Sequence, residues 1–290
     1  MKYLGISISA LLRYRIHSLL ACLKYNMFFV WPGQKQLKTT ALLRNSARGK
    51  SAFVFANGPS LARLNPEKIA RLQKQGYDIF AINSYLRSSF FKIAAPDYFL
   101  ISDPAYFGDY RYLSKEQLAG NGMQEALADL AELKKYPEIR LLIPIRYYSK
   151  IKHENIICFN DSEYLWGSNV NDLTRVRGYS SMTAYKSLAA ACHLGYDKIY
   201  ICGFDNNYFK HLFVNKKNEM FYRDEHFYDL DNPLIWKVHS YEGLSVGQLL
   251  WSHHFKFTDL EKFKNEPVIN LDPDSLVDAF PKEHTLDVYQ

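Results

Sequence analysis

A group of polar residues stands directly after the first short apolar run of the sequence. Asn57-Gly58-Pro59-Ser60 follows the run 51–56 (SAFVFA). Gly58 allows a tight turn and a close approach of a ligand to backbone amides. Pro59 suits the first turn of a helix, and Ser60 is able to cap that helix or to bond a phosphate. Free N–H groups at a helix start favour an anion, although a plain turn remains the alternative interpretation because no complete nucleotide-loop pattern is present.

Other apolar runs are also followed by polar side chains. The residues concerned are Asn83 after 77–82 (YDIFAI), Ser102 and Asp103 after 97–101 (DYFLI), and Gly203 and Asp205 after 198–202 (KIYIC). Each of them taken alone is equally well explained as a turn or cap residue. If the runs are strands of one parallel sheet, however, their carboxyl ends lie at the same edge, where ligands bind in such sheets. We therefore expect these side chains to converge.

A further polar turn leads into the alanine-rich segment 181–194 and overlaps its first residues. The turn contains Ser180, Ser181 and Thr183, and it is a second candidate for an anion-binding helix start. Arg175 or Arg177, just before it, is able to hold a carboxylate. An ordinary helix–strand unit with a solvated arginine is the alternative interpretation.

The stretch 206–241 is rich in Phe, Tyr and Trp and has few signals of regular structure. A long aromatic loop in a compact domain is typical of a lid or a binding loop. It contains His226 and His239, and a histidine that titrates near neutral pH suits a general base. We predict a lid over 206–243 in which one of these two histidines is catalytic, while a structural role remains open for each.

Apolar runs alternate with helical patterns along most of the chain. Strands are predicted at 51–56, 77–82, 97–101, 139–143, 156–159, 198–202 and 267–271, and helices at 66–75, 113–135, 181–194 and 244–251. This alternation predicts an α/β fold with a mostly parallel sheet covered by helices on both faces. We place one domain at 51–280, a linker or short helix at 35–50 and a tail at 281–290.

Composition restricts the class of protein further. The chain has 290 residues, of which 48% are hydrophobic and 23% charged, and these fractions exclude a mostly disordered chain. Its four cysteines show no CxxC spacing, which argues against a zinc site or a disulfide framework and favours a reducing compartment. Asp229/Asp231 and Asp272/Asp274 match the short DxD pattern of manganese-dependent sugar transferases, but such matches are frequent by chance. We predict no metal ligands.

The basic residues are concentrated at the N-terminus. The first 66 residues contain no Asp or Glu, and their basic side chains are Lys2, Arg13, Arg15, Lys24, Lys35, Lys38, Arg44, Arg48, Lys50 and Arg63. Because the remainder of the chain is slightly acidic, a chain-wide nucleic-acid surface is not expected. Segment 4–32 is apolar with helical spacing but is interrupted by cations, so a membrane-spanning helix is not supported. We predict that 1–34 forms a basic amphipathic helix on an anionic membrane surface. Packing on the main domain, or on a second copy in a homo-oligomer, is the alternative.

These motifs together resemble those of a known family. NGPSL after the first strand, Asn after the second, DP after the third, and SSMTAYKSLAAACHLGYDKIYICGFD followed by an HS-containing lid resemble the bacterial sialyltransferases of glycosyltransferase family 42. They are equally similar to the related motility-associated factors and the pterin-pyrophosphokinase-like (MptE-like) proteins. The resemblance covers about residues 50–280. It implies a Rossmann-like domain with a lid, which transfers sialic acid or a similar acid sugar from a CMP donor with inversion.

The resemblance also implies roles for individual residues. Asn57 to Ser60, with Gly58 and Pro59, would hold the CMP phosphate and ribose, and Asn83 would contact the phosphate or sugar. Ser102 and Asp103 stand where the family has a further asparagine. The remaining implied donor contacts are Ser180, Ser181, Thr183, Gly203 and Asp205, with Tyr208 and Tyr222 as the tyrosines that bond the leaving phosphate. His239, which precedes a serine, fits the catalytic base best, and His226 is the second candidate.

The implied protein is a cytoplasmic glycosyltransferase, peripheral on the inner membrane, that serves lipopolysaccharide or capsule biosynthesis. Its donor would be CMP-sialic acid, CMP-Kdo or a similar CMP-sugar, and its acceptor a surface glycan or glycolipid. No cofactor is required by this chemistry, and Mg²⁺ is left open. Two other functions remain as alternatives: an MptE-like Mg²⁺-dependent pyrophosphokinase acting on a small alcohol, in which Asp103 and Asp205 would matter, and a non-catalytic nucleotide-binding module.

Overall fold

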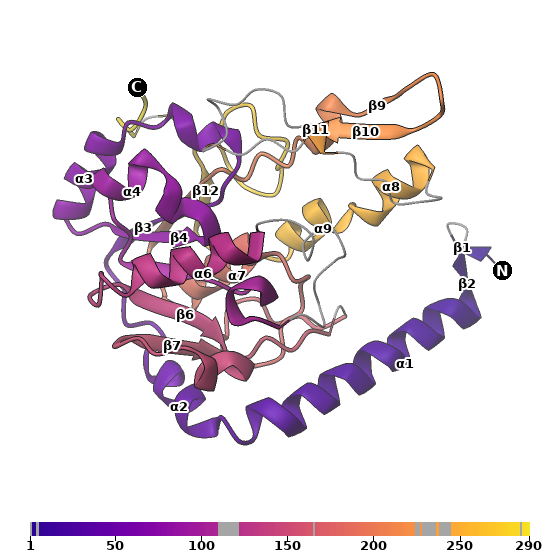
Figure 1. The fold of residues 1–290 in the computed structure, drawn as a ribbon, viewed down its shortest axis with the longest axis horizontal. Helices are drawn as coiled ribbons and strands as arrows, with labels where there is room; N and C mark the ends of the chain where they lie inside the picture. The colour runs from indigo at the N-terminus through magenta and orange to yellow at the C-terminus, as the bar shows by residue number, and fades with distance from the viewer. Residues whose placement is uncertain are drawn as a thin grey trace.

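A seven-stranded parallel sheet forms the centre of the computed structural model, which describes residues 2–3, 6–109, 122–164, 166–223, 227, 236–237, 245–284 and 286–290 (Figure 1). Its strands are β3 (Ser51–Phe55), β4 (Asp78–Ile82), β5 (Tyr98–Leu100), β6 (Arg140–Pro144), β7 (Ile156–Phe159), β8 (Lys198–Cys202) and β12 (Val268–Asn270). They lie in the order β12-β8-β3-β4-β5-β6-β7, and each neighbouring pair is parallel. The predicted α/β fold with a mostly parallel sheet is confirmed.

Both faces of the sheet are buried under helices. Successive strand residues point to opposite faces, so Phe53 and Phe55 of β3 belong to one core cluster and Ala52 and Val54 to the other. The first cluster is covered by α3 (Pro66–Lys74), α4 (Ser89–Ile93) and α6 (Gly122–Leu133), and the second by α7 (Thr183–Leu194) and α9 (Phe255–Glu261). This double cover explains why the strands are apolar throughout rather than alternating.

The strand order reverses between β3 and β8. From β3 the chain continues to β4 on one side, whereas β8 lies on the other side and continues to β12. In open α/β sheets, ligands bind at the carboxyl ends of the strands at such a reversal. The turn that begins at Asn57 and the segment that begins at Gly203 both leave the sheet at this point.

The N-terminal region contains two helices. They are α1 (Ile8–Tyr25), extended by the π-helical turn η1 (Asn26–Val30), and α2 (Gln34–Leu42); β1 (Lys2–Tyr3) and β2 (Ile6–Ser7) precede them. The residues predicted as a linker or short helix therefore include α2, which packs on β7 through a hydrogen bond from Thr40 Oγ1 to the carbonyl oxygen of Cys158 (2.7 Å). In Figure 1, α1 runs along the outside of the domain.

The predicted lid segment contains short elements where the structure describes it. They are η7 (Tyr208–His211), β9 (Phe213–Val214), β10 (Met220–Arg223) and β11 (Trp236–Lys237), with α8 (Val246–Ser252) following. The three strands form an antiparallel sheet in the order β11-β10-β9. His226, His239, Asp229 and Asp231 lie outside the described residues.

The C-terminal residues, which we predicted as a tail, pack on the domain. Val288 is fully buried, its carbonyl oxygen accepts a hydrogen bond from the Asn65 N–H (2.7 Å), and Leu64 forms a β-bridge with Tyr289. All four cysteines, Cys22, Cys158, Cys192 and Cys202, are free and buried.

Candidate functional site

The turn after β3 lies against the end of β8 with almost no space between them. The Gly58 N–H donates a hydrogen bond to the Gly203 carbonyl oxygen (3.0 Å). A Cβ atom at position 58 would come within 2.0 Å of Asp205 Oδ2 and 2.5 Å of the Gly203 oxygen. Gly203 itself has a left-handed φ of +78°, and a Cβ there would come within 2.2 Å of the Ala56 oxygen. Both glycines are therefore required by the close approach of two strand ends.

Ser60 holds Asp205 in place. The Ser60 hydroxyl donates to Asp205 Oδ2 (2.8 Å) and accepts from the Gly203 N–H (3.0 Å), while the Ser60 N–H donates to Asp205 Oδ1 (3.1 Å). Ser60 is buried, and its hydroxyl does not cap the 3₁₀-helix η2 (Pro59–Arg63). Because β3 and β8 are neighbours, the serine predicted to cap a helix or to bind a phosphate bonds to Asp205.

The carboxyl group of Asp205 has a pKa well above that of an ordinary aspartate. Burial raises the pKa of Asp205 to about 6, and the neighbouring carboxylate of Asp272 acts in the same direction, while the hydrogen bonds from Ser60 oppose the rise. A carboxyl group that is easily neutralised repels a nearby anion less than an ordinary aspartate does.

A cavity of about 350 Å³ lies at the carboxyl ends of β3, β4 and β8, and we call it the switch-point cavity. The predicted site residues that it brings together are Asn57, Gly58, Pro59, Asn83, Ser181, Thr183, Gly203 and Asp205. The half-buried Lys256 in the first turn of α9 also lines it. Residues from four separate segments of the sequence thus converge at one edge of the sheet, as the strand-end argument predicts.

Two amide oxygens in this cavity are buried without a hydrogen-bond partner among the described residues, namely Asn57 Oδ1 and Asn83 Oδ1. Asn83 also has a left-handed φ of 46°, a conformation that is uncommon for residues other than glycine. Buried polar atoms are nearly always hydrogen-bonded in folded proteins. Two acceptors left open at a cavity wall therefore suit a ligand with hydroxyl or amino donors. The Ser180 Oγ is also buried without a partner in the described part of the chain, while its N–H donates to Asp259 (2.8 Å).

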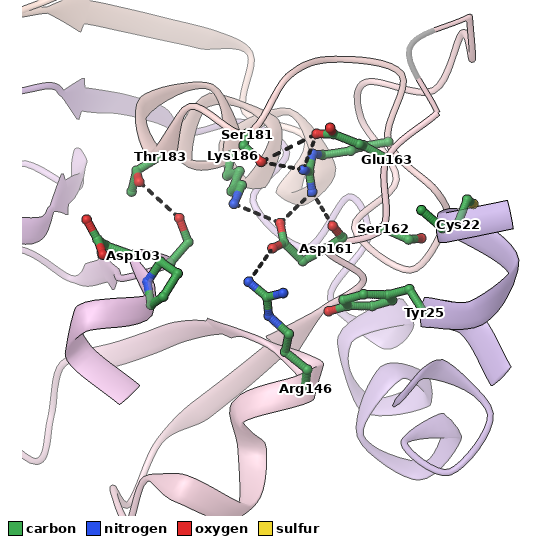
Figure 2. Close-up of a pocket in the computed structure, with 14 residues that line it drawn as sticks. Cys22, Tyr25, Asp103, Arg146, Asp161, Ser162, Glu163, Ser181, Thr183 and Lys186 are labelled. Atoms are coloured by element: carbon green, nitrogen blue, oxygen red, sulfur yellow. Dashed lines mark hydrogen bonds and ion pairs between the residues drawn. The ribbon is translucent and has the colours of Figure 1, made fainter. Parts of the chain in front are cut away.

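A second cavity, of about 490 Å³, lies beside the first, and Figure 2 shows its walls. We call it the charged cavity because its lining includes Asp103, Arg146, Asp161, Glu163, Arg177 and Lys186. Ser181 and Thr183 line both cavities, so the two meet at the start of α7. The other side of the charged cavity is formed by Ala21, Cys22 and Tyr25 of α1.

Asp161 is the centre of a buried group of charges in this cavity (Figure 2). Its carboxylate pairs with Arg177 (2.5 Å) and Lys186 (2.8 Å), and Arg146 lies 3.9 Å away. Burial alone would raise the pKa of Asp161, but Arg177 and Lys186 outweigh it and hold the pKa below the ordinary value. Burial lowers the pKa of Lys186 to about 8 against the opposing effect of Asp161. The cluster therefore presents both hydrogen-bond donors and acceptors to a ligand.

Ser102 and Asp103 occupy the boundary of the charged cavity. The Ser102 hydroxyl lies 2.9 Å from the Thr183 hydroxyl, and this contact joins the end of β5 to the start of α7. Asp103 Oδ1 accepts a hydrogen bond from the Ala105 N–H (2.9 Å), which caps the 3₁₀-helix η4 (Pro104–Phe107). Asp103 thus has the cap role that was one of its two predicted interpretations, and it lines the cavity as well.

Several cavity residues were missed by the sequence analysis, chiefly Arg146, Asp161, Lys186 and Lys256. A usable signal was present for Asp161, because it follows the predicted strand 156–159 as Asn83 follows 77–82. Lys186 has the weaker signal of standing one helical turn after Thr183. No motif marks Arg146 or Lys256.

The described part of the predicted lid contacts the turn at residues 57–60, which we call the glycine turn. The Phe227 N–H donates a hydrogen bond to the Asn57 carbonyl oxygen (3.1 Å), and the Phe227 ring packs near Tyr85 and Phe90. The backbones of Tyr208 and Tyr222 lie in η7 and β10, but their side chains, like His226 and His239, are outside the description. Among the described residues, no group of three or more His, Cys, Asp or Glu side chains could hold a metal ion.

Comparison with known proteins gives little similarity in sequence. The chain matches no known protein family and none of the curated proteins. A solved structure, the MAf glycosyltransferase from Magnetospirillum magneticum AMB-1, is similar with a TM-score of 0.45 and 11% identity. The similar region covers 87% of this chain and 38% of that chain, so this chain spans well under half of the length of the structure it matches. A similarity of this degree carries no functional inference, and the assignment of function depends on the geometry of the site.

Proposed function

We propose that the protein is a glycosyltransferase that moves an acid sugar from a CMP donor to a glycan or lipid-linked acceptor. The observation that carries this proposal is the switch-point cavity. There the buried amide oxygens of Asn57 and Asn83, which lack partners among the described residues, line the same cavity as the start of α7. A nucleoside monophosphate offers hydroxyl and amino donors to such oxygens and a phosphate to the N-terminus of α7.

The two adjoining cavities suit the two parts of a nucleotide sugar. With the nucleotide in the switch-point cavity, a sugar on its phosphate would cross the shared wall at Ser181 and Thr183 into the charged cavity. There the Arg146 and Lys186 side chains supply donors for a sugar carboxylate, and Asp161 and Glu163 supply acceptors for hydroxyl groups. The acceptor would enter the same cavity.

The reaction would be a single displacement. The acceptor oxygen forms a bond to the anomeric carbon, the bond from that carbon to the phosphate oxygen breaks, and the electron pair leaves with CMP. A lid histidine takes the proton of the acceptor hydroxyl, with His239 as the first candidate and His226 as the second. The N-terminus of α7 and the Ser181 and Thr183 hydroxyls would stabilise the charge that develops on the phosphate.

The positions of two carboxylates favour this proposal over an Mg²⁺-dependent pyrophosphokinase. Such an enzyme requires carboxylates that together hold metal ions at a polyphosphate. Asp205 lines the switch-point cavity, where Ser60 engages both of its oxygens, whereas Asp103 lines the charged cavity and caps a helix. The two side chains are therefore not arranged as a pair in one cavity.

Titration calorimetry with CMP, CDP and ATP, each with and without Mg²⁺, tests the proposal. We expect binding of CMP without metal, and a decrease of about ten-fold in the Asn83→Gly variant, which keeps the left-handed backbone but removes the amide. Asn218→Gly is the matched control, because Asn218 has a similar φ of 59° in the exposed turn between β9 and β10. Mg²⁺-dependent ATP binding would instead favour the pyrophosphokinase, and binding of none of the three nucleotides would favour a non-catalytic module.

A further inference from the structure

The outer side of α1 carries an apolar ridge that the rest of the protein leaves exposed. Along the helix it consists of Leu12, Ile16, Leu19, Leu20 and Leu23, whose exposed fractions lie between 46% and 57%. Their spacing of three or four residues places them on one helix face. The ridge continues beyond the helix through Met27, Phe28 and Trp31, which are 47%, 54% and 67% exposed.

The opposite side of α1 contacts the domain. Cys22 is buried there and lines the charged cavity together with Ala21 and Tyr25. The Arg15 guanidinium donates to the Tyr164 hydroxyl (3.2 Å), and the Asn26 side chain donates to the Ser162 hydroxyl (3.2 Å). The N-terminal helix therefore contacts the main domain, as the alternative interpretation predicts, but it does so through a side that leaves the leucines facing outward.

Basic side chains flank the ridge. Arg13, His17 and Lys24 are exposed, and their spacing of four and seven residues places them along one side of the leucines. No Asp or Glu occurs in the first 66 residues, so the charged side chains of α1 and η1 themselves are all basic. An exposed apolar face beside cations is complementary to a surface that is both apolar and anionic.

We propose that α1 and η1 lie in the interfacial layer of an anionic membrane, with the ridge among the acyl chains and the cations at the lipid headgroups. None of the helices in the described ranges has the length and hydrophobicity needed to cross a bilayer. The proposal concerns this surface alone and does not depend on the sugar-transfer reaction.

Flotation with lipid vesicles tests the proposal on the full chain. We expect the protein to float with vesicles of phosphatidylcholine that contain phosphatidylglycerol, and to do so less at high salt because the headgroup contacts are screened. Binding to pure phosphatidylcholine should be roughly 30-fold weaker or more, since Arg13 and Lys24 each contribute about 1 kcal/mol to binding at an anionic surface. Equal binding to both vesicle types would overturn the proposal.

Two substitutions on the ridge give the sharpest comparison. Leu19→Ser with Leu23→Ser should reduce vesicle binding about 100-fold, because each buried leucine contributes roughly ten-fold to partitioning. The matched control is Ile93→Ser with Leu127→Ser, which removes two other exposed apolar side chains, from α4 and α6. Both pairs are exposed, so folding should persist, and thermal unfolding checks this.

A second copy of the chain is the competing occupant of the ridge. Light scattering after size exclusion should show a monomer in the absence of lipid. A dimer that the Leu19→Ser/Leu23→Ser variant converts to a monomer, without vesicle binding by the wild type, would overturn the membrane assignment. Vesicle binding that is lost equally in the control variant would also overturn it.

Discussion

At the scale of single residues, hydrogen bonds and close packing join the glycine turn and Asp205 into one unit. Ser60 bonds to both carboxylate oxygens, Gly203 bonds to the Ser60 hydroxyl, and Gly58 leaves the space that the carboxylate fills. The shape of the turn therefore depends on a side chain that stands far from it in the sequence. Changes to any member of this unit should alter the switch-point cavity before they alter the rest of the domain.

The substitution Gly58→Ala tests the tightness of this unit. A methyl group at position 58 would overlap Asp205 Oδ2 and the Gly203 oxygen, so we expect a loss of about 1–3 kcal/mol in the free energy of unfolding together with a loss of CMP binding. Gly247→Ala in α8 is the control, because a Cβ there would meet only Ser245 Oγ at 3.9 Å. Urea unfolding measures both, and an unchanged Gly58→Ala protein would contradict the close packing.

Asp205 should make stability depend on pH. Its ordinary pKa is 3.8 and its folded value about 6, so the folded protein holds this proton more tightly than the unfolded chain does. The resulting stabilisation is present below the unfolded value and is lost as pH rises through about 6. Between pH 5 and 7.5 the wild type should lose about 1 kcal/mol relative to Asp205→Asn, which has no such titration. Urea unfolding measures the free energy of unfolding of both proteins. If the difference between the two proteins is the same at both pH values, the pKa of the Asp205 carboxyl group is not raised.

The lid histidines carry the prediction about catalysis. His239→Ala should lower kcat about 10²–10⁴-fold with CMP affinity unchanged, because it removes the base and not the nucleotide site. His226→Ala is the paired variant; His226 directly precedes Phe227, whose N–H bonds to the Asn57 oxygen. If only the His226 variant loses turnover, the role moves to that residue, and if neither does, the base is not a histidine of the lid.

Single cavity residues were predictable where they stand just after a predicted strand. Asn57, Asn83 and Asp205 follow apolar runs, and the parallel sheet brings them to one cavity. The hydrogen bonds from Ser60 to Asp205 were not predictable. They depend on β8 being the neighbour of β3, and strand order is not visible in a single sequence.

At the level of elements, α7 joins the two cavities. Its first turn supplies Thr183 to both of them, and Lys186, one turn later, reaches Asp161 after β7. Burial of residues 184–194 fixes the helix against the sheet, so these side chains have little freedom to move.

The elements of the central sheet were predictable because strands buried on both faces are continuous apolar runs. The short elements β9, β10 and β11 were missed, since strands of two to four residues leave no periodic pattern.

The buried charges between β7 and α7 should contribute strongly to stability. Asp161→Asn leaves Arg177 and Lys186 without their shared carboxylate, and we expect a loss of about 3–5 kcal/mol in the free energy of unfolding. Asp287→Asn makes the same change in an exposed pair with Lys68, where solvent screens the charges and little change is expected. Chemical unfolding of the two variants side by side measures the contrast. Equal effects would mean that the Asp161 cluster does not hold the two elements together.

Taken as a whole molecule, α1 stands between the proposed membrane surface and the charged cavity. Its outer side carries the ridge. Its inner side forms a wall of that cavity through Cys22 and Tyr25 (Figure 2). If the acceptor is lipid-linked, removing the ridge with Leu19→Ser/Leu23→Ser should lower turnover on acceptor carried in anionic vesicles about ten-fold or more. Turnover on a soluble acceptor should stay the same in both proteins. A similar loss on both acceptors, measured as CMP release, would mean that the substitutions disturb the cavity and not the membrane contact.

The most direct test of the central claim is the release of CMP from acid-sugar donors without added metal. Purified protein is supplied with CMP-sialic acid or CMP-Kdo and a glycan acceptor, and CMP is measured over time. We expect turnover of at least one of these donors, decreased about ten-fold in Asn83→Gly and unchanged in Asn218→Gly. Release at the same rate in both variants, or no release from either donor while ATP is consumed with Mg²⁺, would contradict the assignment of the switch-point cavity to a CMP-sugar.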